Sequence, residues 1–210
     1  MIHGNYIRSK TMSENISKLV HAIHFSAVAH RNQRRKDSDK TPYINHPIEV
    51  MHILSEAGIT DIDTLCAAVL HDTIEDTGVS YEQLCNEFGT SVACIVSECS
   101  DDKSLPKEVR KQEQIKHAAH VSNQAKLVKS ADKLSNLCGL DINPPTKWSQ
   151  EEINGYFTWS YAVWLSLRGC NKNLDNQLEK LFSSKELLTI TPEELENRLT
   201  SYYGNIKYSE

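Results

Sequence analysis

The stretch Cys66-Ala-Ala-Val-Leu-His71-Asp72-Thr-Ile-Glu75-Asp76-Thr77 places four ionisable side chains within six residues, directly after an apolar run typical of a buried helix. Residues three and four apart share a face of a helix, so we expect Glu75 beside both His71 and Asp72. Asp76 is expected beside Asp72 for the same reason. Burying these groups unpaired would be costly, and a bound metal ion would supply the missing positive charge. A solvated helix end, marked by Gly78, is the alternative that this stretch alone leaves open.

Length and composition describe a globular domain rather than a membrane or nucleic-acid-binding protein. The 210 residues are long enough to bury a core, and no window approaches the roughly 18 apolar residues of a membrane span. A net charge of −5 argues against a nucleic-acid surface. The six cysteines form no Cys-x-x-Cys pair and fall mostly at apolar helix positions, which predicts reduced thiols in a cytoplasmic protein.

The hydrophobic pattern predicts an all-α fold, a single globule of about eight to ten helices. Capping signals recur along the chain, and no stretch shows the alternation of apolar and polar residues that a half-buried strand requires. The first helix is expected to begin at Ser13, an N-cap residue, and to bury a stripe that runs from Ile16 to Ala27.

One later feature completes the helical pattern. A capping box of Ser149 and Glu152 opens a helix with five aromatic rings, Tyr156, Phe157, Trp159, Tyr161 and Trp164. We expect Phe157 and Trp164 in the core, and the helix is too rich in rings for all five to be buried. We divide the chain into an N-terminal extension (1–12), a globular domain (13–190) and a C-terminal helical extension (191–210).

Two other helices offer side chains that could join the opening stretch. The segment Tyr43-Ile-Asn-His46-Pro47 predicts a helix entrance, with Pro47 in the first turn where its missing N–H does no harm. Asp132 and Asn136 are four residues apart on a helix over 122–139, and Asp132 follows the buried Ala131. Three separate helices therefore supply the candidate metal ligands, which are His46, His71, Asp72 and Asp132.

Two imidazoles and two carboxylates make a mixed nitrogen–oxygen site, which suits Mn²⁺, Fe²⁺ or Zn²⁺ better than Mg²⁺ or Ca²⁺. Water bound by such a metal is acidified, and Glu75 is in position to take its proton, with Asp76 helping to orient it. The basic residues Arg31, Arg34, Arg35 and Lys36 stand together in an acidic chain, which suggests a small polyanionic ligand. A solvated loop is the alternative for them. The pattern as a whole predicts metal-assisted hydrolysis of a phosphoester.

Five motifs, in order, resemble the hydrolase domain of the RelA/SpoT proteins, which are HD-domain phosphohydrolases. These motifs are Arg34-Arg35-Lys36, Tyr43–Pro47, His71–Asp76, Asp101-Asp102-Lys103 and Ala131-Asp132-Lys133-Leu134. The resemblance covers roughly residues 14 to 190 and is strongest to the stand-alone animal form of the family. It implies a helical HD domain over 13–190 and a Mn²⁺-dependent enzyme. Its reaction would remove the 3′-pyrophosphate from the guanosine alarmone ppGpp, leaving GDP and pyrophosphate.

The resemblance also implies roles for individual residues. The implied metal ligands are His46, His71, Asp72 and Asp132. The implied water-activating pair is Glu75 and Asp76. The implied substrate contacts are Arg35 and Lys36 to the base and phosphates, Asn136 to the ribose, and Lys103 and Tyr156. Ser135 departs from the family pattern, where a larger residue often precedes the asparagine, and this could alter the ribose pocket.

Two alternatives remain at this point. The animal form is also similar to an enzyme that removes the 2′-phosphate of NADPH, and no sequence feature separates the two substrates. A nucleotide-binding sensor that has lost catalysis would be expected to lack Glu75 or a metal ligand, and none is missing. The expected partner is therefore a small nucleotide, ppGpp or NADPH. The sequence contains no signal that indicates whether the protein is a monomer or an oligomer.

Overall fold

The structure is a computed structural model that describes residues 2–206, and the side chains of residues 11–206. This range contains ten α-helices of eight residues or more, the short helix α4 and one 3₁₀ turn, η1, but no β-strand, so the predicted all-α fold is confirmed. Arg34 and Pro42 form an isolated β-bridge. It closes the loop over residues 34–42, which carries Arg34, Arg35 and Lys36 and is called the basic loop below. The helices are α1 (Ile2–Ala29), α2 (Asn45–Glu56), α3 (Ile62–Leu70), α4 (Thr73–Asp76), α5 (Tyr81–Phe88), α6 (Thr90–Cys99), α7 (Lys107–His117), α8 (Asn123–Ile142), α9 (Gln150–Leu167), α10 (Lys172–Ser184) and α11 (Pro192–Ile206).

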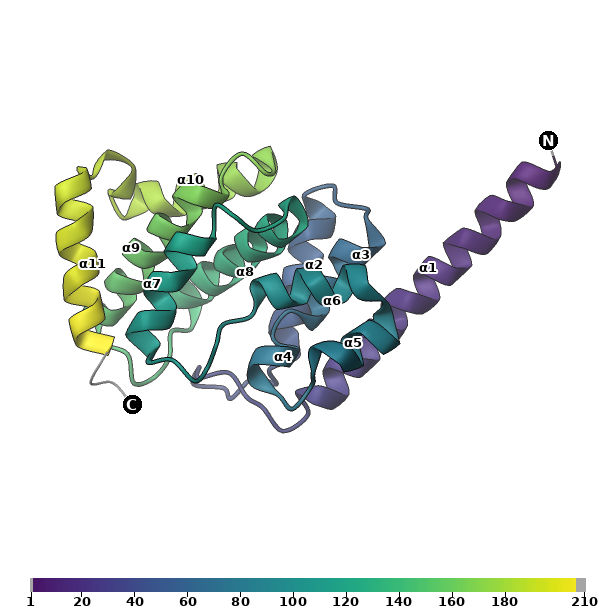
Figure 1. Ribbon diagram of the computed structural model, residues 1–210. Helices are drawn as coiled ribbons and strands as arrows, with labels where there is room; N and C mark the ends of the chain where they lie inside the picture. Colours follow the sequence, from purple (N-terminus) through teal and green to yellow (C-terminus); the bar gives the residue numbers. More distant parts are fainter. Residues whose placement is uncertain (1, 207–210) are drawn as a thin grey trace.

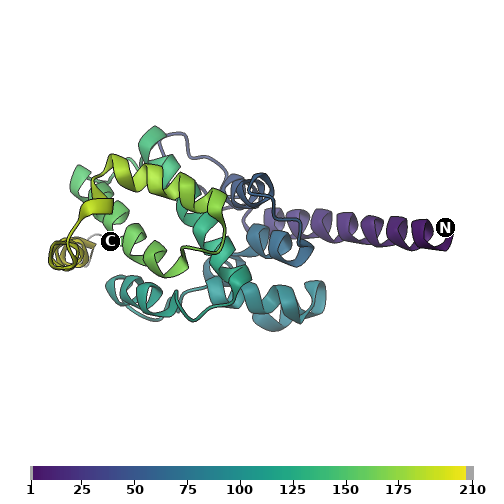
Figure 2. The same ribbon diagram turned by 90° about the horizontal axis from the view of Figure 1, so that it is seen from above.

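Helix α1 is longer than the sequence analysis predicted. It begins at Ile2 instead of Ser13, and its N-terminal half projects away from the other helices (Figures 1 and 2). No proline or glycine lies between residues 5 and 21, so nothing in the sequence interrupts the helix at Ser13. The buried stripe is also shorter than expected, because Ile16 is 53% exposed whereas Ala22 is fully buried. The C-terminal half of α1 packs on α3.

Helix α3 lies at the centre of the N-terminal half. Residues 64–70 are all buried, in contact with α1, α2, α6 and α8. Asp61 caps the helix, with its carboxylate accepting a hydrogen bond from the Thr64 N–H. The end of α3 at Leu70 therefore delivers the next residues, His71 and Asp72, from the core to the site.

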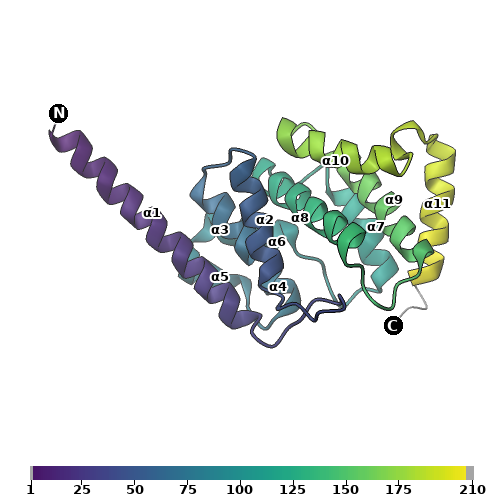
Figure 3. The same cartoon turned by 180° about the vertical axis from the view of Figure 1, so that it is seen from behind.

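Helix α9 lies at the centre of the C-terminal half, and its environment corrects one prediction. All five aromatic rings of α9 are buried, because α7, α8 and α11 surround the helix and Phe182 of α10 packs on Tyr161 and Trp164. Seen from behind, α11 runs alongside α9 at the end of the molecule opposite α1 (Figure 3). Helix α11 is the helix expected in the C-terminal extension (191–210), and its described part covers α9.

Among the described residues, no helix is long and apolar enough to cross a membrane. All six cysteines are free thiols, as expected from their positions in the sequence.

Candidate functional site

A break between α3 and α4 gives the site its shape. The sequence predicts one continuous helix through His71 and Glu75, but α3 ends at Leu70 and α4 begins at Thr73. Neighbouring residues on an unbroken helix point in different directions, so His71 and Asp72 could not both face one point. At the break the Asp72 Oδ2 atom lies 3.0 Å from the His71 Nε2 atom. The Thr73 hydroxyl donates to the Leu70 carbonyl and so caps the interrupted helix.

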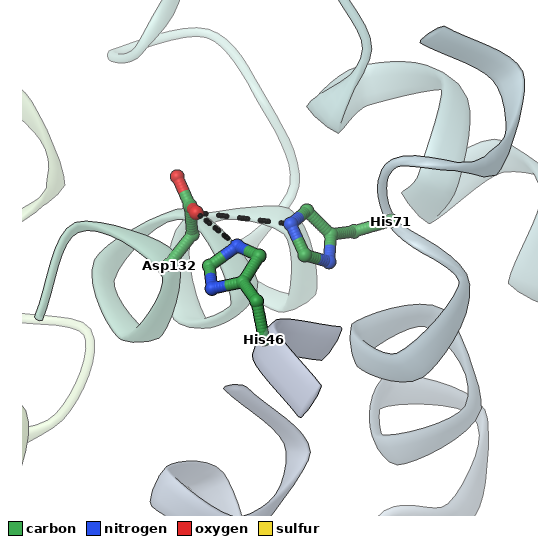
Figure 4. Close-up of side chains that lie close together, drawn as sticks. All are labelled: His46, His71 and Asp132. Carbon is green, nitrogen blue, oxygen red and sulfur yellow. Dashed lines mark ion pairs between the residues drawn. The ribbon is translucent and has the colours of Figure 1, made fainter. Parts of the chain in front are cut away.

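The break brings His71 beside side chains from two other helices. The Asp132 Oδ1 atom of α8 lies 3.1 Å from the His46 Nε2 atom of α2 and 3.7 Å from the His71 Nε2 atom (Figure 4). These three ligand atoms all lie within 4.8 Å of one another. Asp72 stands at the edge of this cluster, with its Oδ2 atom 3.7 Å from the His46 Nε2 atom. The Tyr43 hydroxyl donates to the same oxygen at 2.7 Å and orients it.

One hydrogen bond on the far side of the His71 ring determines which ring nitrogen carries the lone pair. The His71 Nδ1–H donates to the Ala68 carbonyl at 2.8 Å, and since a carbonyl only accepts, the Nε2 atom carries the ring's lone pair. That Nε2 atom is buried and makes no hydrogen bond to the described residues, although two carboxylates stand within 3.7 Å. A lone pair facing carboxylate oxygens requires a cation, which is either a proton or a metal ion.

The pKa values express the same requirement. Burial opposes the charged form of His71, but the negative charges of Asp72 and Asp132 hold its pKa well above the usual value. Burial likewise opposes ionisation of Asp132, yet Lys133 and the two histidines hold its pKa well below the usual value. Two imidazole nitrogens and carboxylate oxygens around a buried point fit a divalent transition metal, which would replace the proton.

The two carboxylates of α4 have separate partners. The Glu75 Oε2 atom accepts from the Asp101 N–H at 3.1 Å, and its Oε1 atom lies 3.6 Å from the Arg110 guanidinium. Burial, followed by the negative charge of Asp101, raises the pKa of Glu75 to about 7. Asp76 accepts from the Gln33 amide at 2.8 Å and forms an ion pair with Lys103. Glu75 is therefore the carboxyl that can exchange a proton near neutral pH.

A single asparagine joins the basic loop to the metal centre. Both terminal nitrogens of Arg35 donate to the Asn136 Oδ1 atom at 3.1 Å. The Asn136 Nδ2 atom donates to the Asp132 Oδ1 atom at 2.7 Å. The loop is therefore tied to a candidate metal ligand instead of being free in solvent, which was the alternative left open by the sequence.

The site opens into two adjoining cavities of about 850 and 560 Å³. Each of the eleven residues singled out from the sequence lines at least one of them, and Arg35 and Asp76 line only the smaller one. Tyr156 lines both, with its ring 5.5 Å from that of Trp148 and 5.2 Å from that of Trp159. The structure thus brings all eleven of these residues to two cavities that share lining residues.

The larger cavity also contains cations that the sequence analysis missed. They come from α7 and α8 and include Lys107, Arg110, Lys111 and Lys133. The Lys111 Nζ atom lies 3.3 Å from the centre of the Trp159 ring, and burial, followed by the charge of Lys133, lowers the pKa of Lys111 to about 7. The four-residue spacing of Lys107 and Lys111 was the available signal, but a polar helix normally indicates a solvated face.

Tyr43 is a second residue of the site that the sequence does not single out. Its hydroxyl donates a hydrogen bond to Asp72 Oδ2. Burial, followed by the negative charge of Asp72, raises the pKa of Tyr43 far above its usual range, so the hydroxyl remains a donor. No periodicity in the sequence indicates that contact, because it joins the end of a loop to the break between two helices.

Comparison with known proteins gives consistent matches. The sequence profile of the HD domain matches residues 22–156. The chain is 50% identical over 165 residues to guanosine-3′,5′-bis(diphosphate) 3′-pyrophosphohydrolase MESH1 of Danio rerio, covering 78% of this chain and 92% of that protein. It is 48% identical over 177 residues to the protein of the same name from Homo sapiens, covering 84% and 99%.

A solved structure agrees with these matches. It belongs to a metazoan ortholog of SpoT, described as hydrolysing ppGpp and playing a role in starvation responses. The TM-score is 0.79 with 48% sequence identity, and the match covers 81% of this chain and 96% of the other. The likeness therefore extends over nearly the whole of the relatives.

Proposed function

The chain belongs to the HD-domain family, in the branch of the MESH1 pyrophosphohydrolases, and on this premise we propose that it hydrolyses ppGpp to GDP and pyrophosphate. One observation carries the proposal. The buried, unpartnered Nε2 atom of His71 and the Nε2 atom of His46 face the same carboxylate oxygen, at the base of a cavity lined with cations. Such a point requires a cation and lies where an anionic substrate can reach it.

Membership of the HD-domain family implies a divalent metal, and we propose that His46, His71, Asp72 and Asp132 hold it. Mn²⁺ is our preferred ion, and Fe²⁺ or Zn²⁺ would also suit a nitrogen–oxygen ligand set. When bound, the metal would acidify water and neutralise charge on the reacting phosphate. Tyr43 would keep Asp72 oriented, since its hydroxyl donates to Asp72 Oδ2.

Glu75 would accept the proton of the attacking water. Its raised pKa of about 7 suits this role, because a general base works best with a pKa near the operating pH. Asp76 would act through Lys103, which it holds by an ion pair and whose Nζ atom is 3.9 Å from the Glu75 Oε1 atom. Lys103 would then place its charge where the phosphate of the substrate approaches.

The remaining residues of the cavities would bind the nucleotide. A bis(diphosphate) carries many negative charges, and the cationic residues of α7 in the larger cavity match that charge. Arg35 and Lys36 would contact the base and phosphates, Asn136 the ribose, and Tyr156 the nucleoside. The reduced cysteines are consistent with work in the cytoplasm, which is part of the same proposal.

A side-by-side assay tests the proposal. Metal-loaded protein is given ppGpp or NADPH under identical conditions, and pyrophosphate or phosphate release is measured with the metal content of the protein. We expect a higher kcat/KM for ppGpp and no release by the Asp72→Ala variant. Preferred release of the 2′-phosphate of NADPH would overturn the substrate assignment. Binding of ppGpp without turnover in Mn²⁺, Fe²⁺ and Zn²⁺ would identify a sensor instead of an enzyme.

A further inference from the structure

A second carboxylate stands behind His46, outside the group of proposed ligands. On the far side of the ring, the His46 Nδ1 atom lies 2.9 Å from the Ser135 Oγ atom, and both residues are buried. The Ser135 hydroxyl in turn donates to the Glu49 Oε2 atom at 2.7 Å. Glu49 is three residues after His46 on α2, so the two side chains share a face, and Ser135 of α8 inserts its hydroxyl between them.

The direction of these hydrogen bonds follows from the number of protons available. A serine hydroxyl has one proton, and the ionised Glu49 carboxylate can only accept, so the Ser135 proton points to Glu49. The Ser135 oxygen must then accept from His46, which places a proton on Nδ1 and leaves the lone pair on Nε2. The Nε2 atom is the one that faces Asp132 at 3.1 Å.

We propose that Glu49 and Ser135 are positioning residues that set His46 as a metal ligand. Glu49 acts through Ser135, because without the carboxylate the hydroxyl is free to rotate and donate to Nδ1 instead. That reversal would protonate Nε2 and remove the lone pair that a metal requires. The hydrogen-bonded carboxylate also fixes the orientation of the ring. The inference rests on the proposed metal site, but it adds two residues that are not among the proposed metal ligands.

The Nδ1 atom of His71 has a different type of hydrogen-bond partner from that of His46. His71 uses a backbone carbonyl, which no substitution of a side chain removes. His46 relies on two side chains, one of them on a different helix. The orientation of His46 therefore depends on the packing of α2 against α8, and it can be tested by substitution. Ser135 is also three residues after Asp132 on α8. One face of α8 therefore supplies both the proposed ligand Asp132 and the hydroxyl that orients the proposed ligand His46.

The experiment measures metal affinity and the tautomer of His46 without nucleotide. Metal-free protein is titrated with Zn²⁺ or Mn²⁺ against a chelator of known affinity, and the ring nitrogens of His46 are assigned by ¹⁵N NMR. We expect Ser135→Ala and Glu49→Ala each to weaken metal binding by about 10- to 100-fold. We also expect Glu49→Ala to remove the proton from the His46 Nδ1 atom, because the Ser135 hydroxyl then donates to that nitrogen, which a merely structural role for Glu49 would not do.

Matched variants separate these effects from general damage. Glu56→Ala removes an exposed glutamate from the same helix as Glu49, and Ser130→Ala removes a buried hydroxyl from the same helix as Ser135. Both should bind metal like the wild type. Ser135→Thr keeps the hydroxyl and should retain most of the affinity. If Ser135→Ala fails to fold, Glu49→Ala at its exposed position still decides the question.

Wild-type metal affinity together with an unchanged Nδ1–H tautomer in Glu49→Ala would overturn the inference. Failure of the proposed function looks different. If the metal site itself is wrong, His71→Ala will bind metal as well as the wild type does. If only the substrate is wrong, metal affinity and the His46 tautomer will still respond to Glu49 and Ser135 as stated.

Discussion

Replacing Glu75 with glutamine should make the metal-free protein more stable while removing its activity. Burial and the charge of Asp101 raise the pKa of Glu75 from its usual 4.5 to about 7. Between these two values the folded protein binds more protons at this site than the unfolded chain, so stability is lost as the pH rises through this window. At about 1.4 kcal/mol per pH unit, the loss reaches about 3 kcal/mol above pH 7.

Glu75→Gln has no charge to bury, so it avoids that loss. At pH 8 the free energy of unfolding of the metal-free variant should exceed that of the wild type by up to about 3 kcal/mol, which is roughly 6–12 °C in Tm for a chain of this length. At pH 4.5 the two proteins should differ little. Urea or thermal unfolding in the presence of a chelator measures the difference, with Glu179→Gln, at an exposed position of α10, as the control.

The same substitution should lower kcat by about 100- to 10,000-fold with metal restored, because it removes the general base. In the wild type, kcat/KM should fall as the pH drops below the pKa of Glu75, since the protonated carboxyl cannot accept a proton. Equal stability of wild type and Glu75→Gln at pH 8 would refute the view that burial and like charge strain this carboxyl. Retained activity would refute its role as the base.

Other predictions concern the contacts around the site. Tyr43→Phe removes the donor to Asp72 Oδ2 and should weaken metal binding by about 10-fold, measured by chelator competition. Gly155→Ala should lower the free energy of unfolding by about 1–3 kcal/mol in urea, because its Cβ would collide with the Tyr202 ring. The double variant Gly155→Ala/Tyr202→Ala should lose less than the sum of the single losses. Removal of the metal should abolish hydrolysis and lower Tm, and readdition should restore both.

The sequence singles out the residues of the candidate metal centre because they are chemically unusual where they stand. Histidine and aspartate directly after a buried apolar run need a partner, and that need can be recognised without coordinates. The break at Leu70 cannot be recognised in this way, since the four-residue rule assumes a regular helix. Nothing in the periodicity shows that the Thr73 hydroxyl caps one helix while a second begins.

Contacts between segments far apart in the chain also could not be predicted from the sequence. The rings of α9 looked too numerous to bury, because the covering helix, α11, begins 25 residues after α9 ends. The residues of α7 are mostly polar, which normally indicates a solvated face, whereas Lys111 reaches inward over the Trp159 ring. In both cases the environment of a side chain depends on tertiary packing, which local patterns do not contain.

The most direct test of the account is the release of pyrophosphate from ppGpp by wild-type and His71→Ala protein, each with Mn²⁺ and with a chelator. We expect rapid release by metal-loaded wild type and release near the uncatalysed rate in the other three reactions. Equal turnover by chelated wild type, verified to be free of metal, would contradict it. So would full activity of His71→Ala, because the site would then work without the nitrogen whose buried lone pair requires a cation.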